Sequence, residues 1–215
     1  MLKHNLDLQK WSRKDHYNFY KNFEEPFFGV TVRIDCTQAY KLSRERAHSF
    51  FLYYLHKSLI AVNTLESFRY RISGDEVLVY DQVNASPTIN RSDGTFGFSY
   101  INYDPDFEVF AKGAREEIER VRSIPSLNPA TSGENVIHYS AMPWLDFTSV
   151  SHARSFTFPD SCPKIAFGKM TENDGKKSFP VSIHAHHALM DGFHVGQFVE
   201  LFQDLMNSND NSNYL

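Results

Sequence analysis

Residues 184–194 read HAHHALMDGFH, and an apolar, strand-like run passes there into an amphipathic helix. Four histidines surround one aspartate and one glycine in this stretch. A strand-to-helix junction places side chains at the end of a sheet, where they can reach a substrate. The spacing from His187 to Asp191, with Gly192 allowing a tight turn of the backbone, suggests one general base and one structural carboxylate.

Hydrophobic periodicity on either side of this junction predicts an α/β fold. Apolar residues at helical spacing predict a final helix over 192–207, and alternation with period two predicts a strand over 28–34. We also expect helices at 13–23, 49–63 and 106–122 and one starting near Asp35 or Thr37, a hairpin of 68–72 and 76–80, and strands at 96–103, 135–141, 146–152, 163–170 and 178–187. This order favours a two-layer α/β sandwich, with a mixed β-sheet and helices packed on one face.

Length and composition limit the class of protein. A chain of 215 residues fits a single domain, which we place at 1–207, followed by a polar tail at 208–215 that should be disordered. The net charge of -4 gives no reason to expect nucleic acid or an anionic membrane as partner. Two distant cysteines, the lack of a signal-like N-terminus and the lack of a membrane-length apolar run indicate a cytoplasmic protein. Aromatic residues make up 15%, which fits an aromatic pocket, a subunit interface or an aromatic core equally well.

The chemistry-bearing residues narrow the reaction type. His184 and His186 share one face of a strand, but no third ligand beyond Asp191 stands out, and we expect no metal. The chain has neither a Gly-x-Ser-x-Gly elbow nor a Gly-rich phosphate loop. The remaining reaction type is one in which a histidine acts directly as general base on a hydroxyl or thiol.

At this point the sequence resembles a known family. Residues 186–192 match the His-His-x-x-x-Asp-Gly signature of the chloramphenicol acetyltransferases (type A), which the acyltransferase cores of 2-oxo acid dehydrogenase complexes share. The following Phe193-His194-Val195 favours the chloramphenicol branch. Further similarity lies at 11–16, 80–81, 95–96, 140–144 and Phe147, so that the resemblance covers nearly the whole chain.

The resemblance implies roles for His187 and Asp191, which begin and end a segment called the catalytic turn below, and for Ser140 and Arg13. His187 would take the proton of the acceptor hydroxyl in a ternary complex with acetyl-coenzyme A, and its own backbone carbonyl would fix its tautomer. Ser140 would donate its hydroxyl to the oxyanion, a contact worth about 2–4 kcal/mol by analogy with other single donors. Asp191 would pair with Arg13 and tie the turn to the N-terminal helix. The family assembles as a homotrimer in which the neighbouring subunit supplies most of the acceptor pocket.

The coenzyme site implied by the resemblance is incomplete in this chain. Lys169 stands at the position of a family lysine near the adenosine 3'-phosphate. Ser49 replaces a second lysine, and Met170 replaces an aromatic residue that stacks on adenine. We therefore expect the nucleotide to be held less tightly, or by other groups such as His48.

The implied acceptor pocket keeps four aromatic residues, Phe19, Tyr20, Phe28 and Phe96. Other positions of this pocket carry residues that differ from those usual in the family.

Glu24, Glu25 and Pro26 replace an apolar or small stretch, His152 and Arg154 replace branched apolar side chains, and Ala166 replaces a threonine. Burial of unpaired charge is costly. Either Glu24 and Arg154 neutralise each other, or the acceptor is more polar than chloramphenicol, or the loop is shifted and its charges face solvent.

The function expected from these residues is acetyl-coenzyme A-dependent O-acetylation, as in antibiotic inactivation by chloramphenicol acetyltransferases. The alternatives are transfer to a more polar hydroxyl or thiol acceptor, such as a sugar or amino alcohol, and a non-catalytic binding module that kept the fold. Ala166 and Ser49 suggest the second alternative. A dihydrolipoyl acyltransferase core is the third.

Overall fold

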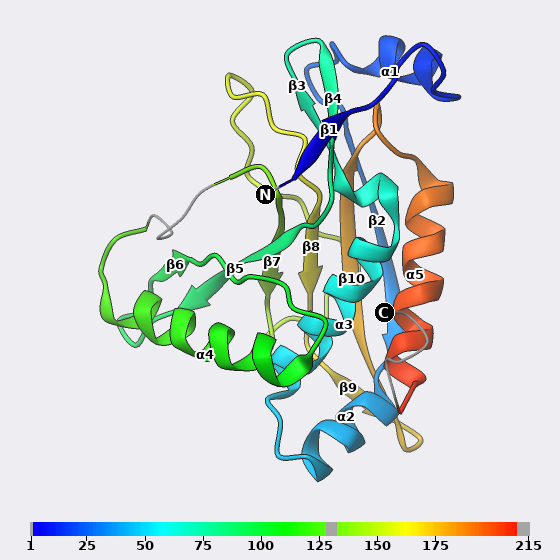
Figure 1. Ribbon diagram of the computed structural model, residues 1–215. Coiled ribbons are helices and arrows are strands. Elements are labelled where there is room, and N and C mark those ends of the chain that lie inside the picture. The colour runs from blue at the N-terminus through cyan, green and yellow to red at the C-terminus, as the bar shows by residue number, and fades with distance from the viewer. Residues whose placement is uncertain (1, 128–132, 210–215) are drawn as a thin grey trace.

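The mixed sheet is laid out in a computed structural model that describes residues 2–127 and 133–209. Along the chain the elements are β1 (Lys3–Asn5), α1 (Lys14–Tyr20), β2 (Phe27–Asp35), α2 (Thr37–Glu45), α3 (Phe50–Thr64), the 3-10 turn η1 (Glu66–Arg69), β3 (Tyr70–Ser73), β4 (Glu76–Tyr80), β5 (Asn84–Asn90), β6 (Phe96–Phe98), α4 (Phe107–Ser123), β7 (Val136–Ala141), β8 (Lys164–Phe167), β9 (Thr171–Asn173), β10 (Lys176–His186) and α5 (Gly192–Asn207). Figure 1 shows their arrangement.

Seven strands of the described residues form the main sheet, in the order β2-β10-β8-β7-β5-β6 with β9 beside β10. The pairs β7–β8 and β5–β7 are parallel, whereas β10 runs antiparallel to both β2 and β8. The sheet is therefore mixed, and the predicted α/β fold class is confirmed.

One face of this sheet is apolar and carries the helices. Ile165, Phe167, Val181 and Ile183 alternate along β8 and β10 and belong to one buried cluster with residues of α2, α3, α4 and α5. The side chains between them point to the other face, because successive residues of a strand alternate. The helices α2, α3 and α5 lie together on one side of the sheet, as predicted (Figure 1).

The opposite face of the sheet is polar. It carries His138 and Ser140 of β7, Lys164 of β8, and His184 and His186 of β10. Residues 142–163, which form no helix or strand, lie over part of this face, where His152 packs edge-on against His184 with ring centroids 4.8 Å apart.

The predicted strand at 146–152 is thus wrong. Its alternating pattern reflects side chains that touch the sheet, such as Phe147 against Gly168, and no backbone pairing with a neighbouring strand is formed. Of the strand predicted over 96–103, only Phe96–Phe98 is regular, as β6, but its antiparallel pairing with β5 continues to a bridge between Ile101 and Ala85. The ladder is incomplete between them because Pro87, opposite Ser99, has no N–H to donate.

A small sheet, β1-β4-β3, packs beside the catalytic turn. It contains the predicted hairpin, with Gly74 at φ 59° in the turn. Tyr17 of α1 and Val79 of β4 share a buried cluster with Ala188 and Leu189. The segment between β10 and α5 is therefore fixed by packing on the N-terminal elements.

The remaining boundaries follow the sequence closely. The helices predicted at 49–63, 106–122 and 192–207 end within one residue of α3, α4 and α5, whereas α1 is shorter than predicted. The strands β1, β5 and β9 were not predicted. No helix within the described ranges is long and apolar enough to cross a membrane. Cys36 and Cys162 are both free and buried. The tail predicted to be disordered lies, apart from Ser208 and Asn209, outside the described residues.

Candidate active site

The turn from β10 to α5 holds His187 by its backbone. The His187 N–H donates to the Pro26 carbonyl (2.8 Å), next to the start of β2. Asp191 is the N-cap of α5 and accepts from the backbone N–H of Phe193 (3.1 Å) and from Nδ1 of His194 (2.9 Å). This satisfies the first turn of the helix, which is what an N-cap aspartate does.

Aromatic rings fix the imidazole of His187. The ring of Tyr20 stacks on it at 4.2 Å with an interplanar angle of 5°, and Phe28 packs against it at 4.7 Å. Its Nδ1 is buried and has no hydrogen-bond partner elsewhere in the described part of the chain. Nε2 is therefore the ring nitrogen left to meet a substrate, and the bond from Nδ1 to the residue's own carbonyl stays a prediction.

Arg13 joins the turn to the N-terminal segment. Its guanidinium forms an ion pair with Asp191 and also donates to the His187 carbonyl (3.3 Å). Partial burial raises the pKa of Asp191, but hydrogen bonds from His194 and Arg13 outweigh it and hold the pKa at about 2. The Asp191 carboxylate is thus ionised at any physiological pH, and it contacts the side chains of Arg13 and His194.

Ser140 lies in a different place. It lines a cavity of about 270 Å³ on the polar face of the sheet, together with Thr88, His138, His152 and Lys164. His187 is not among the residues that line this cavity.

The strand register gives the separation of Ser140 and His187. Ser140 pairs with Ala166, and Ala166 pairs with Ser182, two strands away. His187 lies five residues further along the chain than Ser182. With about 3.3 Å per residue and about 4.8 Å between strands, Ser140 and His187 are on the order of 19 Å apart. One chain alone cannot bring both side chains to one reacting atom, since that needs hydrogen-bond reach of about 3 Å.

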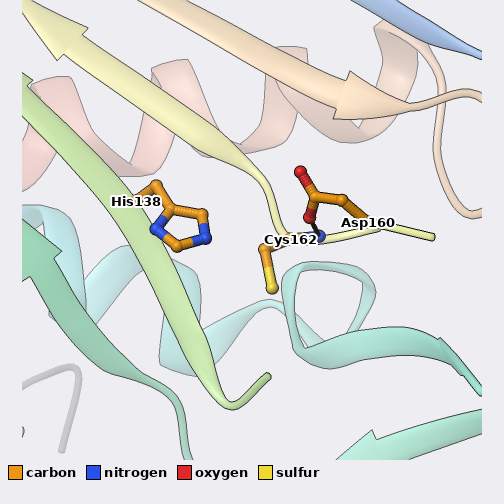
Figure 2. A group of neighbouring side chains, drawn as sticks. All are labelled: His138, Asp160 and Cys162. Carbon is orange, nitrogen blue, oxygen red and sulfur yellow. Dashed lines mark hydrogen bonds between the residues drawn. The ribbon is translucent and has the colours of Figure 1, made fainter. Parts of the chain in front are cut away.

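A cluster of side chains beside this cavity was not predicted from the sequence. His138, Asp160 and Cys162 offer one metal-ligand atom each within 4.8 Å of one another (Figure 2). Burial lowers the pKa of His138 to about 4, so its ring is neutral at pH 7. The short spacing of Asp160 and Cys162 is the only hint of this cluster in the sequence.

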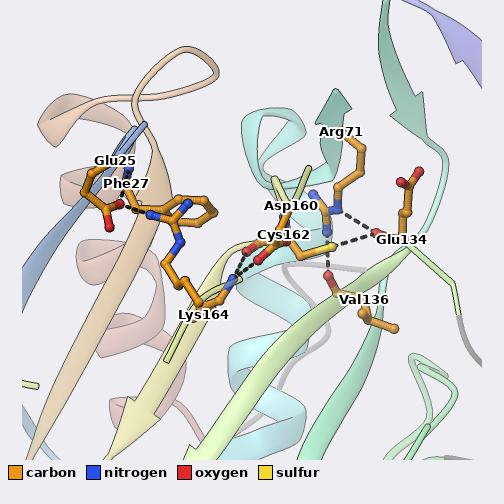
Figure 3. A network of polar contacts seen from close by, with 9 residues as sticks. Glu25, Phe27, Arg71, Glu134, Val136, Asp160, Cys162 and Lys164 are labelled. Carbon is orange, nitrogen blue, oxygen red and sulfur yellow. Dashed lines mark hydrogen bonds and ion pairs between the residues drawn. The ribbon is translucent and has the colours of Figure 1, made fainter. Parts of the chain in front are cut away.

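Positive charge surrounds the cluster and disfavours a cation. The Lys164 amino group pairs with Asp160 and donates to the Cys162 carbonyl (3.2 Å). The Cys162 thiol donates to the Glu134 carbonyl (3.3 Å), which also accepts from Nε of the buried Arg71 (2.6 Å; Figure 3). A divalent ion would have to displace the ammonium group from Asp160. We therefore regard His138, Asp160 and Lys164 as part of the polar wall of the Ser140 cavity.

The acceptor residues suggested by the sequence fall into two groups. Tyr20 and Phe28 lie against His187, with Phe19 edge-on to Tyr20 and 64% exposed. His152 lines the Ser140 cavity, whereas Phe96 is exposed and packs on Phe98, which does line it.

Of the alternatives for the acceptor loop, the pairing of Glu24 with Arg154 is wrong by one residue. Arg154 pairs with Glu25 and stacks over the Phe27 ring at 4.1 Å, whereas Glu24 is exposed. Glu25 is exposed as well, and its carboxylate also accepts from the Phe27 N–H (3.1 Å) where the chain enters β2. Arg154 is thus neutralised within the chain.

A larger, mostly apolar cavity of about 730 Å³ lies between α3, α4 and the sheet. Ser49, Met170 and Arg115 line it, but the exposed Lys169 does not. Thr88 contributes to the lining of both this cavity and the Ser140 cavity.

His48 is engaged elsewhere, since it contacts Glu108 at 3.5 Å. Arg115 and Arg122 of α4 bring cationic groups to the larger cavity, and Arg122 is paired with Glu119 (2.8 Å). Neither arginine was predicted to lie at a binding cavity, because arginines on a charged helix are usually solvent-exposed surface residues.

Comparison with known proteins gives one family across the chain. The family model described as chloramphenicol acetyltransferase matches residues 1–203. Chloramphenicol acetyltransferase 3 of Escherichia coli is 31% identical over 206 residues, which cover 94% of this chain and 96% of the relative. The chloramphenicol acetyltransferase of Bacillus pumilus is 28% identical over 200 residues, covering 92% and 91%.

Solved structures agree with this result. A chloramphenicol acetyltransferase superposes with a TM-score of 0.88 at 28% identity, covering 95% of this chain and all of that one. The cubic core of the pyruvate dehydrogenase multienzyme complex superposes with a TM-score of 0.69 at 16% identity, covering 97% and 91%. The second likeness concerns the fold alone.

Proposed function

The chain belongs to the chloramphenicol acetyltransferase family and is an acyltransferase, and from that premise we propose that it transfers an acetyl group from acetyl-coenzyme A to a hydroxyl group, with His187 as general base. The observation that carries the proposal is the setting of His187. Its ring is clamped between Tyr20 and Phe28, and its Nδ1 is buried, so that Nε2 alone can accept a proton.

The donor fits the larger cavity. The family uses acetyl-coenzyme A as donor, and a cavity of about 730 Å³ with a mostly apolar wall suits its pantetheine arm. Arg115 supplies a cation for the phosphates where the family lysine is replaced by Ser49. Thr88 lines both this cavity and the one around Ser140, which supports a thioester carbonyl placed near the Ser140 hydroxyl.

The proton path follows from these positions. His187 takes the proton of the acceptor hydroxyl as its oxygen attacks the thioester carbonyl. Ser140 donates a hydrogen bond to the oxygen that becomes negative, which is usually worth about 2–4 kcal/mol. His187 then returns the proton to the leaving thiolate. No covalent enzyme intermediate is needed, so donor and acceptor are bound together.

The separation of Ser140 and His187 within one chain supports a site shared between subunits. We infer a homotrimer in which His187 of one subunit faces Ser140 of the partner subunit. Exposed apolar side chains are available for such an interface, including Phe19, Phe156 and Phe158, each more than 60% exposed in the single chain. A cyclic arrangement of this kind is heterologous and closes into a ring.

Replacement of His187 by alanine tests the proposal. The release of coenzyme A thiol is followed with acetyl-coenzyme A and a hydroxyl acceptor, and the formation of an O-acetyl ester is checked by mass spectrometry. A general base contributes about 10²–10⁴-fold, so His187→Ala should lose at least that factor in kcat. His4→Ala, at an exposed histidine of β1, is the matched control. Unchanged turnover by His187→Ala would rule out His187 as the general base. Absence of acetyl transfer by the unmodified chain would instead favour the binding-module alternative.

A further inference from the structure

The wall of the Ser140 cavity is unusually polar for a site that would hold an aryl alcohol. Hydroxyl groups of Ser86, Thr88 and Ser140 line it from β5 and β7. The rings of His138 and His152 lie beside them, and Nε2 of His152 is buried with no hydrogen-bond partner in the ranges that the structure describes. An unpaired buried polar group costs free energy unless a ligand satisfies it.

The same wall offers no net charge to a ligand. Lys164 and Asp160 neutralise each other, and Lys164 is also held by the Cys162 carbonyl. Burial lowers the pKa of both His138 and His152 to about 4, so both rings are neutral at pH 7. The nearby Arg154 is paired with Glu25.

The size of the cavity adds a third observation. At about 270 Å³ within one chain it lies just below the range of about 300–1,000 Å³ that is typical for drug-sized ligands. Phe98 provides one apolar side, against which the C–H face of a sugar ring can pack.

We propose that the acceptor of this acetyltransferase is a small, uncharged polyhydroxyl molecule of the sugar class, recognised by Ser86, Thr88, His138 and His152. The inference rests on the proposed function and names its substrate class. An apolar acceptor would leave these groups desolvated and unpaired, at a cost of about tenfold in kcat/KM for each group left without a partner.

An acceptor panel tests the inference with the full chain and acetyl-coenzyme A. Release of coenzyme A thiol is measured at equal concentrations of glucose, N-acetylglucosamine, ethanolamine, a hydroxycarboxylate and chloramphenicol, and products are identified by mass spectrometry. We expect kcat/KM for a sugar to exceed that for chloramphenicol by about tenfold or more. Preference for chloramphenicol, the amine or the hydroxycarboxylate would overturn the substrate class and leave the acetyltransferase proposal intact. Absence of release with every acceptor would overturn both.

A specificity exchange gives a second, independent readout. His152→Leu removes the unpaired ring and restores the branched apolar residue expected for a drug pocket. It should lower kcat/KM for the preferred sugar about tenfold, mainly through KM, and raise that for chloramphenicol by a similar factor. Ser86→Ala, which removes only a hydroxyl, should lower the sugar value about fivefold and serves if His152→Leu does not fold. His4→Leu, far from the cavity on β1, is the control. Equal effects of His152→Leu on both acceptors would contradict the assignment.

Discussion

The ion pair between Arg13 and Asp191 allows the strongest quantitative test of how the catalytic turn is held. We would replace Asp191 by asparagine, which is as good an N-cap as aspartate and so leaves the bond to the Phe193 N–H in place. Arg13→Met removes the guanidinium and keeps most of its apolar stem. The double variant completes a cycle that isolates the pairing from the capping.

The magnitude follows from the burial of the pair. The side chains of Arg13 and Asp191 are 11% and 29% exposed. Breaking a fully buried pair costs about 3–5 kcal/mol and an exposed pair about 0–1 kcal/mol, so each single variant should lose about 2–3 kcal/mol of unfolding free energy. Hydrogen bonds from His194 and Arg13 together hold the pKa of Asp191 at about 2, below its ordinary 3.8, so the carboxylate stays ionised in the pair. In a chain of this length such losses lower the Tm by about 5–10 °C.

The assay is urea unfolding followed by tryptophan fluorescence, together with acetyl transfer. We expect a coupling energy of about 1–2 kcal/mol in the cycle, because the two singles break the same contact. Loss of the Arg13 bond to the His187 carbonyl should lower kcat about 10–100-fold through misplacement of the base. Strictly additive single effects would refute the pairing. A loss of activity in Asp191→Asn as large as in His187→Ala, with unchanged stability, would instead mean that Asp191 acts on the substrate.

Two further predictions concern assembly and pH. Ser140→Ala and His187→Ala should each be nearly inactive. When the two variants are unfolded and refolded together in equal amounts, about a quarter of the active sites should be restored, since each shared site takes one residue from each of two subunits. A mixture as inactive as its components would place the site within one chain. Burial lowers the pKa of His138, His152 and His186 to about 4, against an ordinary value of 6.5. Between pH 4 and pH 6.5 the unfolded chain therefore binds more protons than the folded chain, and the free energy of unfolding falls as the pH is lowered through that window. The urea midpoint should therefore decrease below pH 6.5 and level off above it, and a midpoint independent of pH would contradict the neutral, buried state of these rings.

The sequence predicted helices and strands correctly where the local pattern of residues and the tertiary packing favour the same element. The junction at 184–194 predicts the end of β10 and the start of α5, because an apolar strand and an amphipathic helix have different periods and Asp191 is a strong N-cap. The strand β5 was missed since Asn84-Ala85-Ser86-Pro87 has little β propensity. Its pairing with β6 and β7 and the burial of one face override that weakness.

Side-chain partners were harder to predict than elements. Arg154 pairs with Glu25 and not with Glu24, and the carboxylate of Glu25 also accepts a backbone hydrogen bond at the entry to β2, which hydrophobic periodicity does not reveal. Gly29 shows the same limit: a Cβ there would lie 2.3 Å from Nε2 of His184, so the glycine makes room for the ring of its pairing partner on the neighbouring strand. Such contacts depend on which strands become neighbours.

The division of the site between two faces explains how one fold can serve different acceptors. His187 stands on a turn that is fixed by Arg13, Asp191 and the packing of Leu189, all remote from the Ser140 cavity. The acceptor groups instead come from the polar face of the sheet and from residues 142–163, which form no regular structure and can change with little effect on the core. A substitution such as His152→Leu therefore alters what is acetylated without moving the base that carries out the reaction. The catalytic turn accordingly indicates the chemistry, and the wall of the cavity determines the substrate.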